Sequence, residues 1–326
     1  MKKTISFIGT GKMAAALISC IYKKKLAKEI IASDHKEENL RKIKSKFNVK
    51  TTTDNKEAAR NSDIVFICVK PQDIELVLNE IKDEIKNQLI VSIAAGIKIS
   101  RIESILGKKR IMRVMPNINC LVGEMAAGFS AGKYATKEDI KEVERLLNSA
   151  GTAYFVKEEL LDAVTAVGGG SAPAFFAYFI EAIAKEGMKN GLPKQISYGL
   201  AAKAALGTGK FILEKKIMPE ELIKVVASKK GTTVAGLKIL EKTGIRIERM
   251  IDVQRRGYYP EGGAKVEVKI FPARLGELKL RERGVLKRIL MLSGAAESLK
   301  NKKAAERQLI GAREILGQLK LPLEEK

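Results

Sequence analysis

The chain has 326 residues, of which 45% are hydrophobic, and its formal net charge is +22. This length allows two domains with sizeable cores. No apolar run reaches the roughly 18 residues of a membrane span, so we expect a cytoplasmic protein with no membrane contact. One histidine and three widely separated cysteines lack the spacing of a zinc site, and we expect no metal.

The positive charge by itself would suit a nucleic-acid-binding protein. The basic residues, however, are interleaved with glutamates, as in Glu142-Val-Glu144-Arg145, which is typical of solvated helix faces. Aromatic residues make up only 5% of the chain, so few rings are available to stack on bases. We therefore do not expect nucleic acid as the main partner.

The first predicted element is an apolar strand at 5–8, followed at once by Gly9-x-Gly11-x-x-Ala14 and an apolar helix. Strand, glycine turn and helix in this order are the context of a dinucleotide-binding fingerprint. Gly9 permits the turn, and Gly11 lets the backbone approach a pyrophosphate, which the N–H groups of the helix N-terminus can bind. A plain glycine turn is the alternative. The fingerprint predicts cofactor contacts from Gly9, Thr10, Gly11, Lys12 and Met13.

Strands and helices then alternate through the first half of the chain. Strands are expected at 30–33, 50–52, 63–69, 89–93 and 111–114, and helices at 37–47, 55–61 and 73–85. Continuous apolar strands between helices predict a parallel sheet covered on both faces, with ligands beyond the carboxyl ends of the strands. Structural turns at these ends are the alternative. The further cofactor-binding candidates are Ser33, Asp34, Val69, Lys70, Pro71, Ala94 and Asn117.

The sequence leaves the choice of cofactor open. Asp34 lies about 20 residues beyond the fingerprint, where an acid often binds the ribose diol of NAD, and this favours NADH. If Asp34 faces the ribose, Asp34→Ser should shift the preference towards NADPH. His35 and Lys36 follow directly and could instead meet the 2′-phosphate of NADPH.

From about residue 155 the pattern changes to helices, expected at 158–167, 173–190, 194–214 and 219–227. The helix at 173–190 is apolar nearly all round, so it must be covered on several sides. In a domain this small, another subunit is the expected cover. We therefore expect a homodimer or larger oligomer, with an interface in or beside Phe175, Phe176, Phe179 and Ile180.

A second candidate site is Ser228-Lys229-Lys230-Gly231-Thr232-Thr233, where a further helix is expected to start at the threonines. Free N–H groups at a helix start, flanked by hydroxyl groups, suit a carboxylate or a phosphate. A plain helix cap would have the same sequence pattern.

Seven motifs occur in order along the chain: Gly9-Thr-Gly-Lys-Met-Ala14, Val69-Lys-Pro-Gln72, Val91-Ser-Ile-Ala-Ala-Gly96, Arg113-Val-Met-Pro-Asn117, Leu121-Val-Gly-Glu124, Asp162-Ala-Val-Thr-Ala166 and Gly231-Thr-Thr-Val-Ala-Gly236. Together they resemble pyrroline-5-carboxylate reductases, over residues 1 to about 252. The resemblance implies a Rossmann-type domain followed by an all-helical dimerisation domain. It also implies reduction of the cyclic imine 1-pyrroline-5-carboxylate to L-proline by NADPH or NADH, the final step of proline biosynthesis.

The resemblance also implies roles for individual residues. The substrate carboxylate would meet Ser228, Gly231, Thr232 and Thr233, while Lys70, Pro71 and Asn117 would line the nicotinamide side. Lys70 and Thr233 are the candidate catalytic residues. A protonated imine is already an electrophile, so the protein's task is positioning and electrostatics rather than strong acid catalysis.

We expect three parts: a dinucleotide-binding domain at 1–153, a helical substrate and dimerisation domain at 154–253, and a basic C-terminal extension at 254–326. The extension does not match the family, and it carries 17 Lys and Arg against 9 Asp and Glu. The chain also has Lys229-Lys230 where the family usually has Pro-Gly.

Besides a basic binding protein that retains DNA, two other functions remain open. One is a non-catalytic nucleotide-binding homologue. The other is a related Rossmann reductase such as a β-hydroxyacid dehydrogenase, which needs a lysine and an asparagine on the helix after the linker. Residues 173–184 contain neither.

Overall fold

The computed structural model describes residues 2–228 and 231–243. These belong to the first of two compact units, 1–262, whereas the second unit, 263–326, lies outside the described residues. The expectations for Lys229-Lys230 and for the extension at 254–326 also fall outside the described part of the chain.

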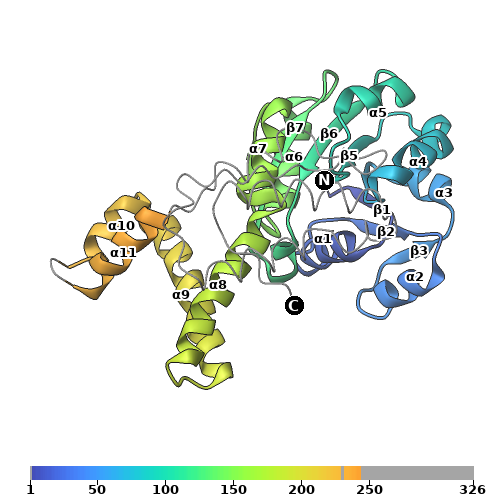
Figure 1. The fold of residues 1–326 in the computed structure, drawn as a ribbon. Coiled ribbons are helices and arrows are strands. Elements are labelled where there is room, and N and C mark those ends of the chain that lie inside the picture. The colour runs from blue at the N-terminus through green and yellow to red at the C-terminus, as the bar shows by residue number, and fades with distance from the viewer. Residues whose placement is uncertain (1, 229–230, 244–326) are drawn as a thin grey trace, which may run out of the picture. The chain divides into compact units, whose positions relative to one another are not determined.

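The N-terminal half is built on an eight-stranded sheet with the strand order β3-β2-β1-β4-β5-β6-β7-β8 (Figure 1). The strands are β1 (Thr4–Ile8), β2 (Glu29–Ser33), β3 (Lys50–Thr52), β4 (Ile64–Ile67), β5 (Leu89–Ser92), β6 (Arg110–Met115), β7 (Met125–Ala131) and β8 (Gly151–Phe155). Strands β1 to β6 all run parallel. The order reverses between β1 and β4, and ligands of such folds bind outside the strand ends at this reversal.

Helices cover both faces of this sheet, because alternate strand residues point to opposite sides. One core joins the sheet to α1 (Lys12–Lys23), α2 (Glu37–Lys44) and α6 (Lys137–Leu147). The other joins it to α3 (Asn55–Arg60), α4 (Ile74–Ile81) and α5 (Ile99–Leu106). In β1, Phe7 faces the first core and stacks on Phe66 of β4 at 4.8 Å, while Ile8 faces the second. The predicted α/β class with a covered parallel sheet is confirmed.

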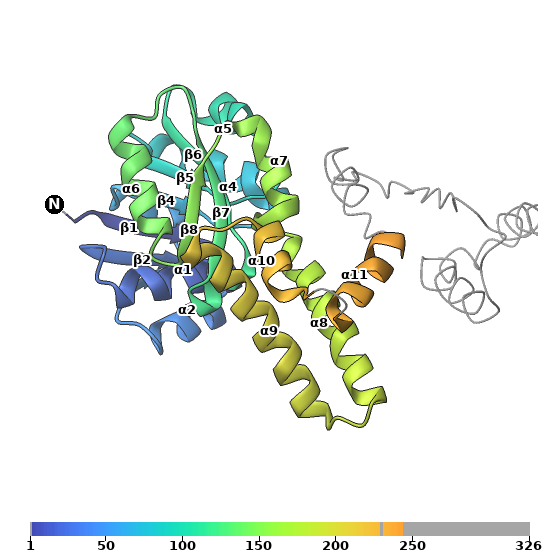
Figure 2. The same cartoon turned by 90° about the vertical axis from the view of Figure 1, so that its left-hand side faces the viewer.

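Strand β7 was missed by the sequence analysis, as were β8, α5 and α6, and β7 runs antiparallel to β6. Its residues, Met125-Ala-Ala-Gly-Phe-Ser-Ala131, are mostly small and do not form a recognisable strand pattern. Only the short helix η3 (Ile118–Val122) and a few flanking residues connect β6 to β7. A parallel crossover needs about a dozen residues or more, so this short connection turns the chain back on itself. Figure 2 shows β6, β7 and β8 side by side.

The second half is helical, as predicted. It comprises η4 (Glu158–Leu160), α7 (Leu161–Val164), the π-helical turn η5 (Thr165–Gly169), α8 (Ala172–Lys189), α9 (Lys194–Lys215), α10 (Pro219–Val226) and α11 (Thr232–Thr243). The single helix expected at 158–167 is therefore three short helical segments. Short helices η1 (Pro71–Asp73) and η2 (Lys82–Glu84) flank α4 in the first half.

One helical run departs from the expectation that no segment is long and apolar enough to span a membrane. The helical run Glu158–Lys189 is long and apolar enough to do so by length and composition alone. A single helix of this kind is weak evidence for a membrane, because helices of globular proteins also pass this test. Within α8, the buried residues are Ala172 and Ala184.

Helices α8 and α9 pack against each other as a hairpin (Figures 1 and 2). Small residues allow the close approach: Ser197 of α9 donates a hydrogen bond from Oγ to the Ala184 carbonyl of α8 at 2.7 Å. A Cβ atom on Gly187 would overlap that same Ser197 Oγ. The hairpin contact therefore depends on Gly187 having no side chain.

Replacing Gly187 with alanine should lower the free energy of unfolding by about 1–3 kcal/mol, because the new methyl group overpacks the helix contact. Urea unfolding measures this change. The double variant Gly187→Ala/Ser197→Ala should lose less than the sum of the two single variants, since the overlapping oxygen is absent. Simple additivity of the two losses would contradict this account of the contact.

Candidate functional site

The predicted nucleotide-site residues gather along one edge of the sheet. Strand register aligns Ile8 with Ser33 and with Ile67, and Ile67 with Ser92. Because these strands are parallel, the segments that follow them leave the sheet at the same edge. Those segments contain the candidates Gly9 to Met13, Asp34, Val69 to Pro71, Ala94 and Asn117, and Ser33 ends its own strand there.

Gly9 makes the turn that joins β1 to α1. Its φ of +86° lies in the left-handed region, which residues with a Cβ rarely adopt. A Cβ there would also lie 2.9 Å from Val69 Cγ1 and 3.0 Å from the Cys68 carbonyl carbon. Gly9 N donates a hydrogen bond to the Ser33 carbonyl at 2.8 Å. The turn is therefore held between the ends of β2 and β4, where only glycine fits.

Gly11 and the start of α1 have the features that a phosphate group needs. A Cβ on Gly11 would meet no atom of the described chain within 4 Å, so the backbone is open on that side. No side chain caps this helix, and its first turn contains no acidic residue. The first N–H groups of α1 are thus available to an anion, and the helix dipole favours one. The N-terminus of α1 therefore fits the pyrophosphate of a dinucleotide.

Asp34 is bound to the glycine turn by a network of hydrogen bonds. Its Oδ2 accepts from Thr10 N and from Thr10 Oγ1, both at 2.8 Å, and from Asn39 Nδ2 at 3.1 Å. Its Oδ1 accepts from Lys36 N at 2.9 Å. Burial raises the pKa of Asp34, but the hydrogen bonds from Lys36, Thr10 and Asn39 outweigh it and hold the pKa below the ordinary value of 3.8. The carboxylate is therefore ionised at neutral pH while only 5% exposed.

Asn117, after β6, is buried and bonded on both sides of its amide. Its Nδ2 donates to the Gly168 carbonyl in η5 at 2.7 Å, and its Oδ1 accepts from Ala126 N of β7 at 3.3 Å. These bonds tie the end of β6 to β7 and to the π-helical turn. A role beside the nicotinamide stays a prediction.

The remaining nucleotide-side candidates differ in exposure. Lys70 is exposed and stands at the start of η1, while Val69 and Pro71 are half-buried. Ala94 is buried, and its N–H donates to Ser92 Oγ at 3.3 Å. Of these four candidates, Lys70 is thus the most open to a ligand. Cys68 is half-buried beside this edge, and its desolvation raises the thiol pKa. A thiol held protonated in this way does not suit nucleophilic chemistry.

The second candidate segment lies at the start of α11. Gly231 N donates to the Ser228 carbonyl at 3.0 Å, forming a tight turn. A Cβ on Gly231 would lie 2.5 Å from Ser228 Oγ, so a side chain there would displace the Ser228 hydroxyl group. Ser228, Thr232 and Thr233 are all exposed. The hydrogen bonds described for this segment are local, and they do not join it to the nucleotide-side candidates.

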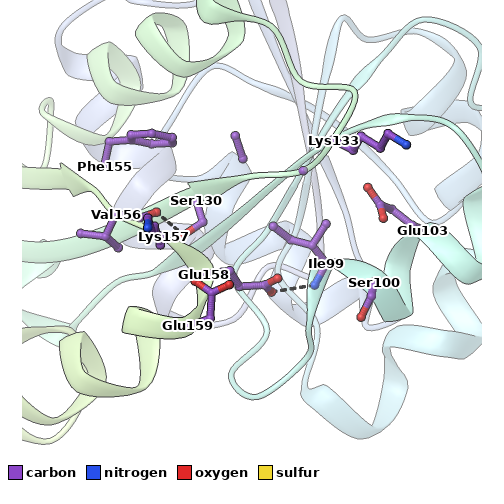
Figure 3. A pocket seen from close by; sticks show the side chains of 12 residues that line it. Ile99, Ser100, Glu103, Ser130, Lys133, Phe155, Val156, Lys157, Glu158 and Glu159 are labelled. Atoms are coloured by element: carbon purple, nitrogen blue, oxygen red, sulfur yellow. Dashed lines mark hydrogen bonds between the residues drawn. The ribbon is translucent and has the colours of Figure 1, made fainter.

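A hollow of about 570 Å³ lies elsewhere on the protein, beside α5 (Figure 3). Much of its polar lining is already engaged. Glu158 Oε1 accepts from Ile99 N at 2.7 Å and from Arg113 Nη1 at 3.0 Å, and Ser130 Oγ donates to the Val156 carbonyl at 2.7 Å. The predicted site residues do not line this hollow.

Comparison with known proteins identifies the chain's relatives. A family profile described as pyrroline-5-carboxylate reductase dimerisation matches residues 158–255. The pyrroline-5-carboxylate reductase of Methanosarcina acetivorans is 41% identical over 255 residues, which cover 77% of this chain and 94% of that protein. The chain belongs to the pyrroline-5-carboxylate reductase family. The predicted family is confirmed, and the dimerisation profile implies that the protein self-associates.

Other members of the pyrroline-5-carboxylate reductase family are also similar. The enzyme of Aquifex aeolicus is 38% identical over 243 residues, covering 74% of this chain and 90% of that protein. The structure of the Coxiella burnetii reductase matches with a TM-score of 0.75 at 29% identity, covering 78% and 97% of the two chains. That of the Plasmodium falciparum reductase with NADP bound matches with a TM-score of 0.70 at 28% identity, covering 78% and 96%. Residues 4–96 also match a profile described as NADP oxidoreductase, coenzyme F420-dependent.

Two parts of this family member's site were missed by the sequence analysis. Asn39 contributes a hydrogen bond to Asp34, but a single asparagine on a charged helix gives no signal of this. Gly168 accepts from Asn117, and here a signal existed, because three consecutive glycines at 168–170 interrupt an apolar helical pattern.

The Asp34 network makes stability depend on acid pH. A carboxyl group whose pKa is lowered on folding stabilises the protein above its unfolded pKa, and this stabilisation is lost as the pH falls through the folded value. The free energy of unfolding should therefore decrease below about pH 4, near the ordinary aspartate value, and decrease less steeply for Asp34→Asn. Urea unfolding at pH 3 to 6 measures both slopes. Equal slopes for the two proteins would contradict the network.

Proposed function

We propose that the protein reduces 1-pyrroline-5-carboxylate to L-proline with a nicotinamide cofactor, NADPH or NADH. The observation that carries this proposal is the uncapped N-terminus of α1 behind Gly11, open at the strand edge that also bears Val69, Lys70 and Pro71. Membership of the pyrroline-5-carboxylate reductase family gives the substrate.

The nucleotide would be held by the turn between β1 and α1. Gly9 and Gly11 leave room for the backbone to approach the pyrophosphate, and the N–H groups of Lys12 and Met13 bind it. Val69, Pro71, Ala94 and Asn117 form the rest of the edge in this proposal. When bound, the nicotinamide supplies the hydride, which is chemistry that belongs to the cofactor.

The substrate carboxylate would be held by the turn before α11. Thr232 and Thr233 are exposed at the first helical positions, where N–H groups and hydroxyl groups can both donate to an anion. Ser228 and Gly231 complete the turn. Lys70 adds a positive charge on the nicotinamide side and helps to orient the anionic substrate. A protonated imine needs no strong protein acid, so these residues accelerate the reaction by positioning it.

Self-association belongs to the same proposal, through helix α8. Phe176 is 62% exposed within the single chain, and Tyr178 and Ile183 are exposed as well. Obligate interfaces cover apolar surface of this kind, commonly with more than about 2,000 Å² buried in total. We place Phe175, Phe176, Phe179 and Ile180 in or beside the contact between two copies.

The cytoplasm is the proposed location. Cys20, Cys68 and Cys120 are all free thiols, and free thiols suit a reducing compartment. The cytoplasm also suits an enzyme of amino-acid biosynthesis.

Oxidation of NADPH or NADH in the presence of 1-pyrroline-5-carboxylate, with proline as product, tests the activity. Thr233→Ala should raise the KM for 1-pyrroline-5-carboxylate by about ten- to a hundredfold, because a hydrogen bond to a charged group contributes roughly 1.5–3 kcal/mol. Thr152→Ala, an exposed threonine on β8, is the matched control and should leave the KM unchanged. An unchanged KM in Thr233→Ala would remove Thr233 from the site.

Phe176→Glu should weaken the dimer by on the order of a hundredfold, because a buried charge would enter the interface from both copies. Analytical ultracentrifugation over a range of protein concentrations measures the dissociation constant. Leu76→Glu is the matched control, since Leu76 is 73% exposed on α4. A Phe176→Glu protein as dimeric as the wild type would place the interface elsewhere.

A further inference from the structure

Two of the three cysteines lie together where α1 packs against η3. Cys20, in the second half of α1, donates a hydrogen bond from Sγ to the Cys120 carbonyl oxygen of η3 at 3.7 Å. The thiol and the carbonyl oxygen of Cys120 are only a few bonds apart, so the two sulfur atoms are neighbours although 100 positions separate them along the chain. Burial, and then the charge and hydrogen bonding of the Cys20 thiol, raise the pKa of the Cys120 thiol to about 12. The two thiols therefore interact directly across this contact.

These two thiols differ in their access to solvent. Cys120 is 0% exposed in the core between the sheet and α1, whereas Cys20 is half-buried at the margin of the same core. A small oxidant therefore meets Cys20 first, and Cys120 is placed to react with an oxidised Cys20 rather than with the solution. Redox-sensitive sites often combine an accessible cysteine with a second, resolving cysteine beside it in this way.

The backbone is held in place on both sides of the contact. Cys120 N donates to the Asn117 carbonyl and Gly123 N donates to the Cys120 carbonyl, both at 3.2 Å. In α1, Lys24 N donates to the Cys20 carbonyl at 3.1 Å. A disulfide needs its sulfur atoms about 2.05 Å apart, so rotation of the two side chains must close the remaining distance. Neither helix has to unfold for this rotation.

We propose that Cys20 and Cys120 are a peroxide-sensitive thiol pair that closes to a reversible disulfide. Hydrogen peroxide first converts the Cys20 thiol to a sulfenic acid, as its O–O bond breaks and one water leaves. The Cys120 thiol then attacks the sulfenic sulfur: the S–S bond forms, the S–O bond breaks, and the thiol proton leaves with the hydroxyl group as a second water. The two sulfur atoms lose two electrons in total, and the peroxide gains them. A small thiol such as glutathione reverses the step by exchange.

The bond would join two elements of the proposed nucleotide edge. Helix α1 begins at the turn of Gly9 and Gly11, and η3 directly follows Asn117. The pair takes no part in the proposed reduction of 1-pyrroline-5-carboxylate, so the two proposals stand or fall separately. Because the bond closes a loop of about 100 residues and restricts the unfolded chain, the oxidised protein should melt on the order of 10 °C higher than the reduced protein.

The test uses the full-length protein, first reduced and then exposed to hydrogen peroxide. After denaturation in an alkylating reagent, mass spectrometry counts the remaining thiols and identifies linked peptides. We expect two of the three thiols to be protected from alkylation, in a Cys20–Cys120 peptide that dithiothreitol separates, while Cys68 is alkylated as before. Thermal unfolding before and after reduction should show the higher melting temperature of the oxidised protein.

Single variants separate the two roles. Cys120→Ala removes the resolving thiol, so Cys20 should remain a sulfenic acid that dimedone labels. Cys20→Ala should leave Cys120 reduced, because Cys120 is buried. Cys68→Ser is the matched control and should form the disulfide as the wild type does. If Cys120→Ala folds poorly by circular dichroism, Cys120→Ser, which keeps the size of the side chain, takes its place.

Several outcomes would overturn the inference. One is a wild-type protein that keeps all three thiols under peroxide conditions that oxidise free glutathione. Another is a disulfide that includes Cys68, or one that joins two copies of the chain. Loss of the Cys20–Cys120 peptide in Cys68→Ser contradicts a direct reaction between the pair. A lower melting temperature on oxidation would show that the folded protein does not accommodate the bond.

Discussion

The close contact between the end of β1 and the end of β4 is the constraint on which the proposed nucleotide site depends. Gly9 turns the chain with a positive φ directly against Val69, so a side chain does not fit there. This turn aims the N-terminus of α1 at the strand edge. Thr10, the next residue, is then fixed by Asp34 across the end of β2. One glycine thus sets the position of the proposed anion site, and one buried carboxylate keeps it there.

The two halves of the described chain differ in how they bury their apolar residues. The sheet closes two cores of its own, with helices on both faces, and needs no partner for this. Helices α8 and α9 together span 40 residues, yet their buried positions are Ala172, Ala184, Ser197 and Ala201. Small residues hold the hairpin together, while large apolar side chains such as Phe176 remain exposed. The family profile that matches residues 158–255 describes dimerisation, and the proposed interface uses this exposed surface.

The missed elements of the fold share a physical reason. Strands β4 and β5 have continuous runs of large apolar residues, and these are recognisable because both faces of a parallel sheet are buried. Strand β7 is rich in alanine and glycine, and its place in the sheet comes from pairing with β6 and β8 rather than from its own propensity. The stretch at 158–167 was expected to form one helix, whereas it forms η4, α7 and the start of the π-helical turn η5.

The sequence by itself determined the covered parallel sheet, the glycine turn after β1 and the family, because regular spacing and glycines at turns are local properties of a chain. Only the tertiary structure decided what the polar side chains at the strand ends bind. Asp34 has the position of a ribose acceptor in the sequence, but its donors come from Thr10, 24 residues earlier, and from the following helix. Asn117 likewise finds its partner 51 residues away, at Gly168. Hydrogen-bond partners at such separations are set by how the strands and helices pack, and no local pattern reports them.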